Sequence, residues 1–378
     1  MVITARPSYS RIKSVLRAVQ DHPDLELQLV VAASALLDRY GSTVEVIERD
    51  GFEITSRVYM VVEGENLVTS AKSTGLGLVE LATVFDNLKP DVVVTVADRY
   101  ETLATAVAAT YMNIPVAHVQ GGEVTGSIDE KVRHAVTKLS NLHFVSNNLA
   151  AERVIRMGES PDDVFVTGCP SIDLAGEVLA NPALDFDPFE KYGGVGATLD
   201  LSNGYLVVLQ HPVTTEYEEA RAQAVETIYA VHRFGLQVLW FWPNVDAGSD
   251  GTSKGLRVFR ESEKPENFHF FRSFTPEDFL RLLISSKALV GNSSVAIREC
   301  SFLGVPAVNA GSRQERRDRG ANVLDVPHDR DAIAVGIKTQ IAHGYFPSDT
   351  LYGDGSSGER IAALLASVEL RTKKQLCY

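Results

Sequence analysis

Short apolar runs alternate with segments of helical periodicity along the chain, and this alternation limits the possible folds more than any other feature. In residues 8–20, apolar side chains recur at the spacing of one helix face: Ile12, Val15, Leu16 and Val19. Residues 91–96 read Asp-Val-Val-Val-Thr-Val, which predicts a strand buried on both faces of a parallel sheet. The repeated alternation predicts an α/β fold with open, doubly wound sheets.

The alternation restarts after residues 181–194, a stretch rich in turn-forming residues. Strands are expected before it at 25–33, 91–96, 115–119 and 142–145, and after it at 205–209, 236–240, 268–271 and 288–290. We therefore expect an N-terminal domain at 1–175 and a C-terminal domain at 185–356, with the C-terminal helix at 357–378 a candidate to pack back on the first. Two such Rossmann-like domains facing each other make a cleft, and ligands bind outside the carboxyl ends of the strands.

Composition excludes several classes of function. The chain has 378 residues and a formal net charge of −13, which argues against a general nucleic-acid binder. Cys169, Cys300 and Cys377 are widely separated, so we expect a reduced, cytoplasmic setting and no metal site. The sequence lacks an apolar run of the roughly 18 residues that a membrane span needs, and its first residues do not read as a signal peptide.

Polar and charged residues follow the predicted strands of the first domain. Arg6 and Ser10 come after the first strand, where a helix start with an adjacent arginine suits a phosphate, although an ordinary turn explains them equally well. Asp98 and Arg99 directly follow the strand at 91–96. Arg99 is a candidate phosphate ligand and Asp98 a candidate for proton transfer. The alternative is a salt bridge that holds the loop.

The loop after the strand at 115–119 carries more candidates. It runs His-Val-Gln-Gly-Gly-Glu at 118–123 and continues into a helix that contains Arg133 and His134. The two glycines allow a sharp turn close to a ligand. Glu123 and Asp129 are acid or base candidates. The structural alternatives are a helix-start role for Asp129 and a buried, backbone-bonded His118.

The second domain has its own candidates at strand ends. His211 ends one strand, and the segment 243–248, which contains Asn244, follows another. Gly-Asn-Ser-Ser at 291–294 lies between a strand and a helix, an arrangement that suits a phosphate. Glu299 on that helix is a candidate for a ribose diol. The loop 311–319 is dense in charge and is most simply a solvated face, yet one of its arginines is a candidate counter-charge for a nucleoside diphosphate.

Several motifs are absent from the sequence. It contains no GxxxxGK[ST] phosphate loop, no HExxH zinc motif and no GxSxG elbow. The Gly-Leu-Gly at 75–77 does not follow a predicted strand, so it does not indicate a dinucleotide site. These absences disfavour P-loop kinases and ATPases, zinc proteases, α/β-hydrolases and nicotinamide-dependent enzymes.

Taken together, the motifs resemble those of the UDP-N-acetylglucosamine 2-epimerases. The similarity is greatest to the hydrolysing branch, which includes the epimerase half of the bifunctional sialic-acid enzyme. It covers nearly the whole chain, and its modest motifs are specific through their order and spacing. They are Thr-Ala-Arg-Pro at 4–7, Ala-Asp-Arg-Tyr-Glu at 97–101, Gly-Gly-Glu-Val-Thr-Gly-Ser-Ile-Asp at 121–129, Arg-His-Ala-Val-Thr-Lys-Leu at 133–139, Gly-Cys-Pro-Ser at 168–171, His-Pro-Val-Thr-Thr at 211–215, Pro-Asn-Val-Asp-Ala-Gly-Ser at 243–249 and Gly-Asn-Ser-Ser at 291–294.

The resemblance implies a GT-B-like fold with a UDP-sugar in the cleft, a homodimer or homotetramer, and no redox cofactor. It implies elimination of UDP to 2-acetamidoglucal, followed by hydration to N-acetylmannosamine. Catalytic carboxylates are expected at Asp98 and Asp129, with Gln120 and Glu123 as further catalytic candidates. The expected substrate contacts are Arg6, Ser10, Arg99, His118, His211, Asn244, Ser293, Ser294, Glu299 and Arg313.

One position departs from the family pattern. Gln120 stands where well-studied members have a third carboxylate, and an amide cannot exchange a proton at neutral pH. This departure puts in doubt the proton-transfer assignment, the rate or the identity of the sugar. Four alternatives stay open beside the hydrolysing reaction on UDP-N-acetylglucosamine. They are a non-hydrolysing 2-epimerase, a hydrolysing enzyme for a UDP-diacetamido-trideoxy sugar, a GT-B glycosyltransferase, and a protein that binds sugar nucleotides without turnover.

Overall fold

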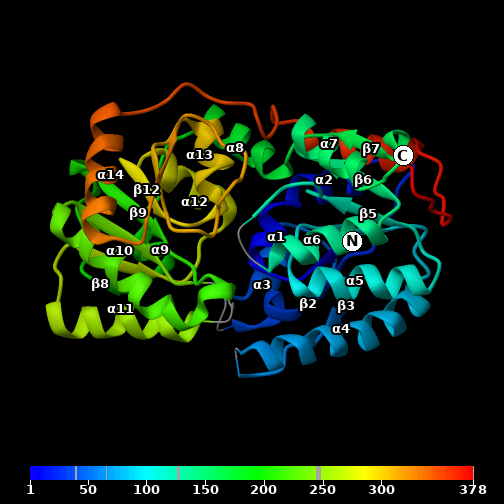
Figure 1. Cartoon of the computed structure of the whole chain (residues 1–378), viewed down its shortest axis with the longest axis horizontal. Helices are drawn as coiled ribbons and strands as arrows, with labels where there is room; N and C mark the ends of the chain where they lie inside the picture. Colours follow the sequence, from blue (N-terminus) through cyan, green and yellow to red (C-terminus); the bar gives the residue numbers. More distant parts are fainter. Residues whose placement is uncertain (39–40, 65, 126–127, 244–247, 378) are drawn as a thin grey trace. The chain divides into compact units, whose positions relative to one another are not determined.

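The computed structural model describes residues 1–38, 41–64, 66–125, 128–243 and 248–377, and it divides into two compact units (Figure 1). The first unit consists of residues 1–124, 128–174 and the segment from Tyr352 onward. The second consists of Thr125 and the described part of residues 175–351. The first unit is therefore discontinuous in sequence, because the C-terminal segment returns to it.

The first unit is built on parallel strands: β1 (Val2–Ile3), β2 (Val30–Ala32), β3 (Ser56–Val58), β4 (Val93–Val96), β5 (Val116–Val119), β6 (Leu142–Val145) and β7 (Val164–Val166). Hydrogen bonds join β1–β2–β3 in one sheet and β4–β5–β6–β7 in another. Strand β1 also lies beside β4, and the described strands of this unit are together called the first sheet. The spatial order β3-β2-β1-β4-β5-β6-β7 is that of a doubly wound fold, with the order reversing between β1 and β4.

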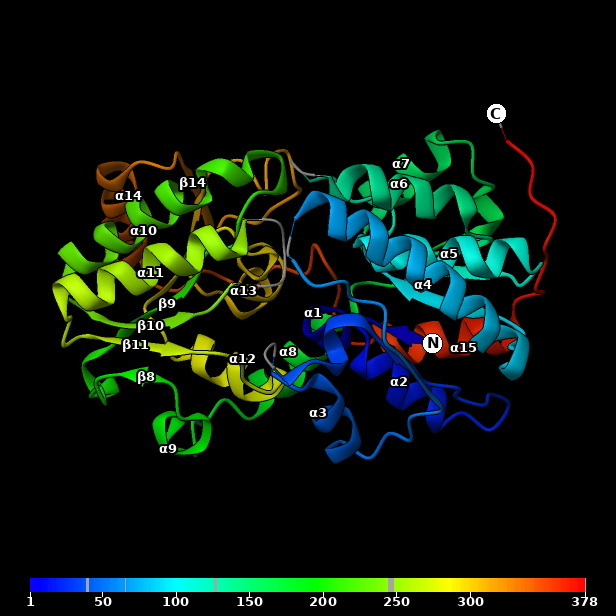
Figure 2. The same cartoon turned by 90° about the horizontal axis from the view of Figure 1, so that it is seen from below.

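Helices cover both faces of these strands: α1 (Arg6–Ser10), α2 (Lys13–Gln20), α3 (Thr43–Arg49), α4 (Leu67–Leu88), α5 (Tyr100–Tyr111), α6 (Asp129–Leu139), α7 (Asn148–Arg156) and α15 (Ser357–Ser367), with the start of α8 (Pro170–Ala180). Helices α4, α5 and α6 pack in sequence, and α15 packs on α2 (Figure 2). Short 3₁₀ turns occur at Ala33–Leu36 and Pro161–Asp163.

The core of the first unit alternates between the two faces of the sheet. Val94 and Val96 of β4 belong to a cluster that includes Ile361 of α15. Val93, one residue earlier, belongs to a second cluster that includes Phe85 of α4. Successive side chains of a strand point to opposite faces, so a strand buried on both sides has to be apolar throughout.

The second unit has one sheet in the order β14-β13-β12-β9-β10-β11-β8. Its strands are β8 (Val195–Gly196), β9 (Tyr205–Leu209), β10 (Gln237–Phe241), β11 (Phe268–Phe271), β12 (Ala288–Gly291), β13 (Ala307–Ala310) and β14 (Val323–Val326). All pairs are parallel except β8 with β11. The order reverses between β9 and β12, which repeats the arrangement of the first unit.

The helices of the second unit are α9 (Pro188–Tyr192), α10 (Ala220–Phe234), α11 (Ser249–Glu263), α12 (Pro276–Ile284), α13 (Glu299–Leu303) and α14 (Arg330–His343). Turns of 3₁₀ type occur at Leu201–Asn203, Thr214–Glu219 and Ser294–Ala296. Helix α10 packs between α11 and α14 (Figure 1). None of the described helices combines the length and apolar character needed to cross a membrane.

The predicted doubly wound α/β architecture is confirmed, but several boundaries differ. The strand expected at 25–33 is limited to β2, because its partners β1 and β3 pair with it only within Val30–Ala32. The sequence pattern predicts a helix only over Leu78–Leu88, whereas α4 begins at Leu67, where the Asn66 side chain accepts a hydrogen bond from the Thr69 N–H at 3.0 Å. The helix expected at 357–378 ends at Ser367, and residues 368–377 are not helical.

Candidate functional site

The reversal between β1 and β4 places Thr4–Arg6 and Ala97–Arg99 at the same edge of the first sheet. The Ser8 hydroxyl accepts hydrogen bonds from the Thr4 and Ala5 N–H groups at 3.2 and 2.9 Å, which fixes the start of α1. Arg6 is the first residue of that helix, and burial lowers the pKa of its guanidinium to about 10. Ser10, on its last turn, donates to the Pro7 carbonyl at 3.1 Å.

Asp98 has a buried cationic partner. Its Oδ2 pairs with the Nη2 group of Arg133, a fully buried residue of α6. Arg133 Nη1 also donates to the Glu123 carbonyl at 2.8 Å and lies 3.3 Å from Glu130 Oε2. A buried charge has to be paired, so these contacts hold the Asp98 carboxylate in one place. The sequence placed Arg133 only on a helix; the structure makes it the residue that fixes Asp98.

Arg99 points to a different partner. Its Nε lies 3.2 Å from Glu101 Oε2, and Glu101 is fully buried at the start of α5. The side chains of Asp98 and Arg99 thus have separate partners, and the ion pair considered between these two neighbours is replaced by Asp98–Arg133 and Arg99–Glu101. Both side chains stay fixed at the strand end.

The loop after β5 is held tightly. Gly122 has φ +74°, and a Cβ there would lie 2.2 Å from the Ala150 carbonyl, so only glycine fits. Glu123 is buried, and its Oε1 accepts a hydrogen bond from the Ser146 hydroxyl at 2.7 Å. Asp129 is half-buried at the first residue of α6, four residues before Arg133. Asp129 and Arg133 therefore lie one helical turn apart on α6, the helix that follows this loop.

His118 is fully buried in β5. Its Nε2 lies 2.8 Å from the Ala97 carbonyl, and its Nδ1 lies 3.3 Å from the Thr137 hydroxyl. Burial lowers the pKa of its ring to about 4, so the ring is neutral at pH 7. Both ring nitrogens therefore have protein partners, in agreement with the structural alternative named for this histidine.

Gln120 follows β5 in the left-handed region, with φ +68°, and Ala97 follows β4 with φ +66°. A side chain with a positive φ costs about 1–3 kcal/mol unless its surroundings hold it there. The Gln120 Nε2 donates to the Cys169 sulfur at 2.9 Å, and the Ser171 hydroxyl lies 3.1 Å from the same sulfur. The Gln120 Oε1 is buried without a hydrogen-bond partner in the described part of the chain.

The second unit carries a comparable site between β9 and β12. Asn292 follows β12 and is fully buried. Its Oδ1 accepts from the His211 N–H and its Nδ2 donates to the His211 carbonyl, both at 2.8 Å. Gly291 has φ +131°, and a Cβ there would lie 2.2 Å from the Leu209 carbonyl. The two strand ends are therefore in close backbone contact.

Other candidates of the second unit gather at this strand end. The Ser293 hydroxyl accepts from the Val295 N–H at 3.4 Å, and buried Arg298 donates to the Ser294 hydroxyl at 3.2 Å. Arg313 Nη1 donates to the Asn292 carbonyl at 3.2 Å. The Glu299 Oε2 is buried and has no hydrogen-bond partner among the residues described. An unpaired buried carboxylate oxygen is unusual and is accounted for when a ligand donates to it.

Asn244, predicted to contact the substrate, lies outside the described residues, as does Ser127 of the loop before α6.

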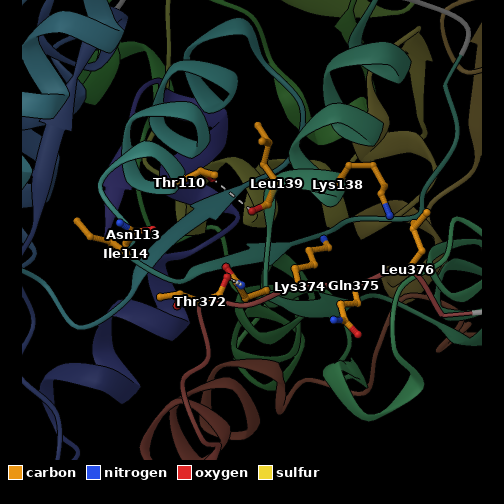
Figure 3. A pocket seen from close by; sticks show the side chains of 10 residues that line it. Thr110, Asn113, Ile114, Lys138, Leu139, Thr372, Lys374, Gln375 and Leu376 are labelled. Atoms are coloured by element: carbon orange, nitrogen blue, oxygen red, sulfur yellow. Dashed lines mark hydrogen bonds between the residues drawn. The ribbon is translucent and has the colours of Figure 1, made fainter.

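A pocket of about 350 Å³ lies at the opposite edge of the first sheet, before β5 and β6 (Figure 3). Lys138 and Lys374 line it, and each ammonium group lies 2.5 Å from the buried Glu159 carboxylate. His143 Nε2 lies 3.0 Å from the same carboxylate. Burial opposes ionisation of Glu159, but hydrogen bonds from His143 and the two lysines lower its pKa to about 2. This cluster anchors the C-terminal segment and is separate from the candidate site.

Known proteins align with nearly the whole of this chain. A protein from Legionella pneumophila named UDP-N,N'-diacetylbacillosamine 2-epimerase (hydrolyzing) is 32% identical over 373 residues, covering 98% of this chain and 96% of its own. A UDP-N-acetylglucosamine 2-epimerase from Neisseria meningitidis is 30% identical over 368 residues, covering 96% of this chain and 93% of its own.

Solved structures share the fold. The UDP-GlcNAc 2-epimerase of Methanocaldococcus jannaschii, in complex with UDP-GlcNAc and UDP, superimposes with a TM-score of 0.77 at 19% identity, covering 96% of this chain and 98% of its own. The N. meningitidis enzyme bound to UDP-GlcNAc gives a TM-score of 0.78 at 18% identity, with coverage of 96% and 98%. The sequence profile of UDP-N-acetylglucosamine 2-epimerase matches residues 17–366. With this match across most of its length, the chain belongs to the UDP-N-acetylglucosamine 2-epimerase family.

Proposed function

We propose that the protein is a hydrolysing 2-epimerase that converts UDP-N-acetylglucosamine and water into N-acetylmannosamine and UDP. The observation that carries this proposal is the buried Asp98 carboxylate, which Arg133 holds at the carboxyl edge of the first sheet. A fixed carboxylate is what removal of a weakly acidic C2 hydrogen requires. Two relatives with hydrolysing reactions in their names, from L. pneumophila and Campylobacter jejuni at 32% and 28% identity, support this branch.

The proposed reaction has two balanced steps. In the first, a base removes the C2 proton, the C1–O bond to UDP breaks, and the electron pair of the C2–H bond forms the C1=C2 double bond of 2-acetamidoglucal. In the second, water adds its oxygen to C1, and C2 receives a proton on the face opposite to the one that lost it. The products are N-acetylmannosamine and UDP. No electrons enter or leave, so the steps need proton-transfer groups and a site for the leaving diphosphate.

We assign proton transfer to Asp98, which follows the carboxyl end of β4, and to Asp129, which is the first residue of α6. Arg133 serves as the positioning residue for Asp98. Glu123 is buried and bonded to Ser146, so we assign it to holding the loop unless substrate releases it. Gln120 cannot exchange a proton at neutral pH, and we assign its amide to orienting the acetamido group or a water. Both ring nitrogens of His118 have hydrogen-bond partners, and its contact with the Ala97 carbonyl holds the residue that precedes Asp98.

We assign binding of UDP to cationic and polar groups of both units. In the first unit, Arg6, Ser10 and Arg99 stand at the carboxyl edge of the sheet, where guanidinium groups stabilise a leaving diphosphate. In the second, the candidates are His211, Asn244, Ser293, Ser294, Glu299 and Arg313. The unpaired Glu299 Oε2 suits the hydroxyls of a ribose, because each hydroxyl supplies a donor to it.

A second substrate deserves a parallel test. The L. pneumophila relative is named for UDP-N,N'-diacetylbacillosamine, and the C. jejuni relative for GDP/UDP-N,N'-diacetylbacillosamine, a diacetamido sugar. The C2 acetamido group and the UDP leaving group are common to both substrates, so the chemistry at C1 and C2 is the same. The two sugars differ at C4 and C6, so the same groups for proton transfer at C2 can serve both.

One NMR time course in buffered D₂O tests the proposal. We expect UDP and N-acetylmannosamine deuterated at C2 to appear from UDP-N-acetylglucosamine. The formation of UDP-N-acetylmannosamine without free UDP would replace the proposal with the non-hydrolysing reaction. If UDP-N-acetylglucosamine persists while UDP-diacetylbacillosamine is consumed, the second substrate is correct. UDP release that depends on an added sugar acceptor would indicate a glycosyltransferase, and UDP binding without turnover of either sugar would indicate a binding protein.

A further inference from the structure

The second site depends on one backbone junction, where the end of β9 meets the end of β12. Asn292 donates its backbone N–H to the Leu209 carbonyl at 3.0 Å. Beyond this bond, the Asn292 side chain takes the place of a neighbouring strand's backbone: it bonds both the N–H and the carbonyl of His211 at 2.8 Å. The position of His211 is therefore set by the position of Asn292.

Gln314 holds Asn292 from the other side. Its Nε2 donates to the Asn292 carbonyl at 3.0 Å, and the same carbonyl accepts from Arg313 Nη1 at 3.2 Å. The Gln314 Oε1 accepts in turn from Arg317 Nη1 at 3.0 Å. Gln314 is only 2% exposed, and both ends of its side-chain amide are bonded to protein groups. An amide suits this place because it donates with one end and accepts with the other.

The electrostatic consequence concerns the anion expected at this strand end. A carbonyl oxygen that points toward a phosphate repels it, whereas a carbonyl engaged by two donors is held and partly neutralised. Gln314 and Arg313 together supply these two donors to Asn292. Gln314 is also the neighbour of Arg313 in sequence, so its bond to Asn292 ties the Arg313 segment to the strand end.

We propose that Gln314 is a positioning residue for the nucleoside-diphosphate site. It holds the Asn292 carbonyl and the Arg313 segment in the geometry that accepts the diphosphate, and it does not contact the ligand itself. This inference rests on the proposed function, because it requires UDP to bind at the ends of β9 and β12. It adds a residue from a charge-dense loop that a sequence pattern assigns to solvated surface.

The chain offers a matched control. Gln340 of α14 is also a buried glutamine of the second unit, at 4% exposure. Its Nε2 donates to the Ala307 and Asn322 carbonyls at 2.8 and 2.7 Å, at the amino end of β13. Gln340 therefore makes comparable backbone contacts at the opposite edge of the same sheet. Its replacement reports the cost of losing a buried amide without affecting the candidate site.

The experiment compares the full chain with Gln314→Leu, Gln314→Glu and Gln340→Leu. The measured quantities are the Kd for UDP by titration calorimetry, kcat and KM for the sugar nucleotide, and the urea midpoint. We expect Gln314→Leu to raise Kd and KM about tenfold, equivalent to loss of one hydrogen bond that preorganises the site. Gln340→Leu should lower the urea midpoint similarly and leave Kd unchanged. Gln314→Glu, which keeps the acceptor for Arg317 but loses the donor to Asn292, should raise Kd at least as much.

The outcomes separate the inference from the proposed function. If wild type binds UDP and both Gln314 variants bind it within twofold of wild type, Gln314 has no positioning role. If Gln340→Leu weakens UDP binding as much as Gln314→Leu, the effect is a general loss of stability and the inference fails. If wild type itself does not bind UDP, the proposed function fails and the inference fails with it. Should Gln314→Leu not fold, Gln314→Glu alone decides between these outcomes.

Discussion

Replacing Asp98 by Asn tests the proposed proton transfer with the smallest possible change. The amide has the shape of the carboxylate, and its oxygen still accepts a hydrogen bond from Arg133. It cannot take a proton from C2 of the sugar at neutral pH. We therefore expect turnover to fall by about 100- to 10,000-fold, the range that general acid–base catalysis contributes, while UDP binding persists.

The structure also sets the expected cost in stability. Asp98→Asn weakens the contact of Arg133 with residue 98, while its contacts with Glu130 Oε2 at 3.3 Å and with the Glu123 carbonyl at 2.8 Å stay in place. A hydrogen bond between charged groups contributes about 1.5–3 kcal/mol, so we expect a loss of about 2 kcal/mol. A domain with a free energy of unfolding of about 5–15 kcal/mol tolerates this loss and stays folded.

The assay measures UDP release, UDP affinity by calorimetry and urea unfolding for Asp98→Asn beside a matched variant, Asp278→Asn. Asp278 is a buried aspartate of the second unit, with Lys191 at 2.6 Å and Arg281 at 3.3 Å. Its replacement should cost comparable stability and leave turnover near wild type. Turnover of Asp98→Asn within threefold of wild type would refute the assignment of Asp98 to proton transfer. Equal losses of turnover in both variants would show that instability, and not chemistry, explains the effect.

Three further outcomes follow from contacts described above. Gln120→Glu should keep kcat within about tenfold of wild type. In the wild type the Gln120 amide donates to the Cys169 sulfur at 2.9 Å, and in the variant the Cys169 thiol donates to the new carboxylate instead. One neutral hydrogen bond contributes only about 1 kcal/mol, so complete loss of kcat would show that the amide itself is required. Gly291→Ala should lower the free energy of unfolding by at least about 1–3 kcal/mol, because φ is +131° and the new Cβ would lie 2.2 Å from the Leu209 carbonyl; an unchanged urea midpoint would contradict this. The pKa of Glu159 is lowered from 4.5 to about 2, so its stabilising effect is complete above pH 4.5 and is lost as the pH falls toward 2. The difference in unfolding free energy between wild type and Glu159→Gln should therefore shrink between pH 5 and pH 2.5, and a difference that does not change over this range would disprove the linkage.

The architecture was accessible from sequence because strands buried on both faces leave an unmistakable apolar run. Val93, Val94 and Val96 belong to clusters on opposite sides of one strand, which is the reason for such a run. The start of α4 was missed because Gly75 and Gly77 lower helix propensity. In the structure Gly75 faces open space, and Gly77 packs against Met60, where a Cβ would lie 2.2 Å from its methyl group.

The candidate site was predictable in its positions but not in its partnerships. Asp98 follows a strand, and the rule that ligands bind at carboxyl ends singles it out. Its partner Arg133 lies 35 residues away, and the contact depends on how α6 packs beside β5 and α5. Asn292 and His211 are 81 residues apart and meet only because β12 pairs with β9. Local pattern carries no information about such pairings, and Gln314 was missed for the same reason.

The return of the C-terminal segment to the first unit has a consequence for the order in which the two units can finish folding during synthesis. Residues 175–351 form a nearly continuous unit and emerge from the ribosome before Ile361 and Leu365, which complete the core beneath α2. Domains generally fold as units during synthesis, with the N-terminal one first. Here the unit whose synthesis starts first is the last that can complete its fold, because Ile361 and Leu365 of its core are translated at the end. Until then the apolar face around Val15 and Leu16 lacks the side chains of α15 that cover it in the folded protein.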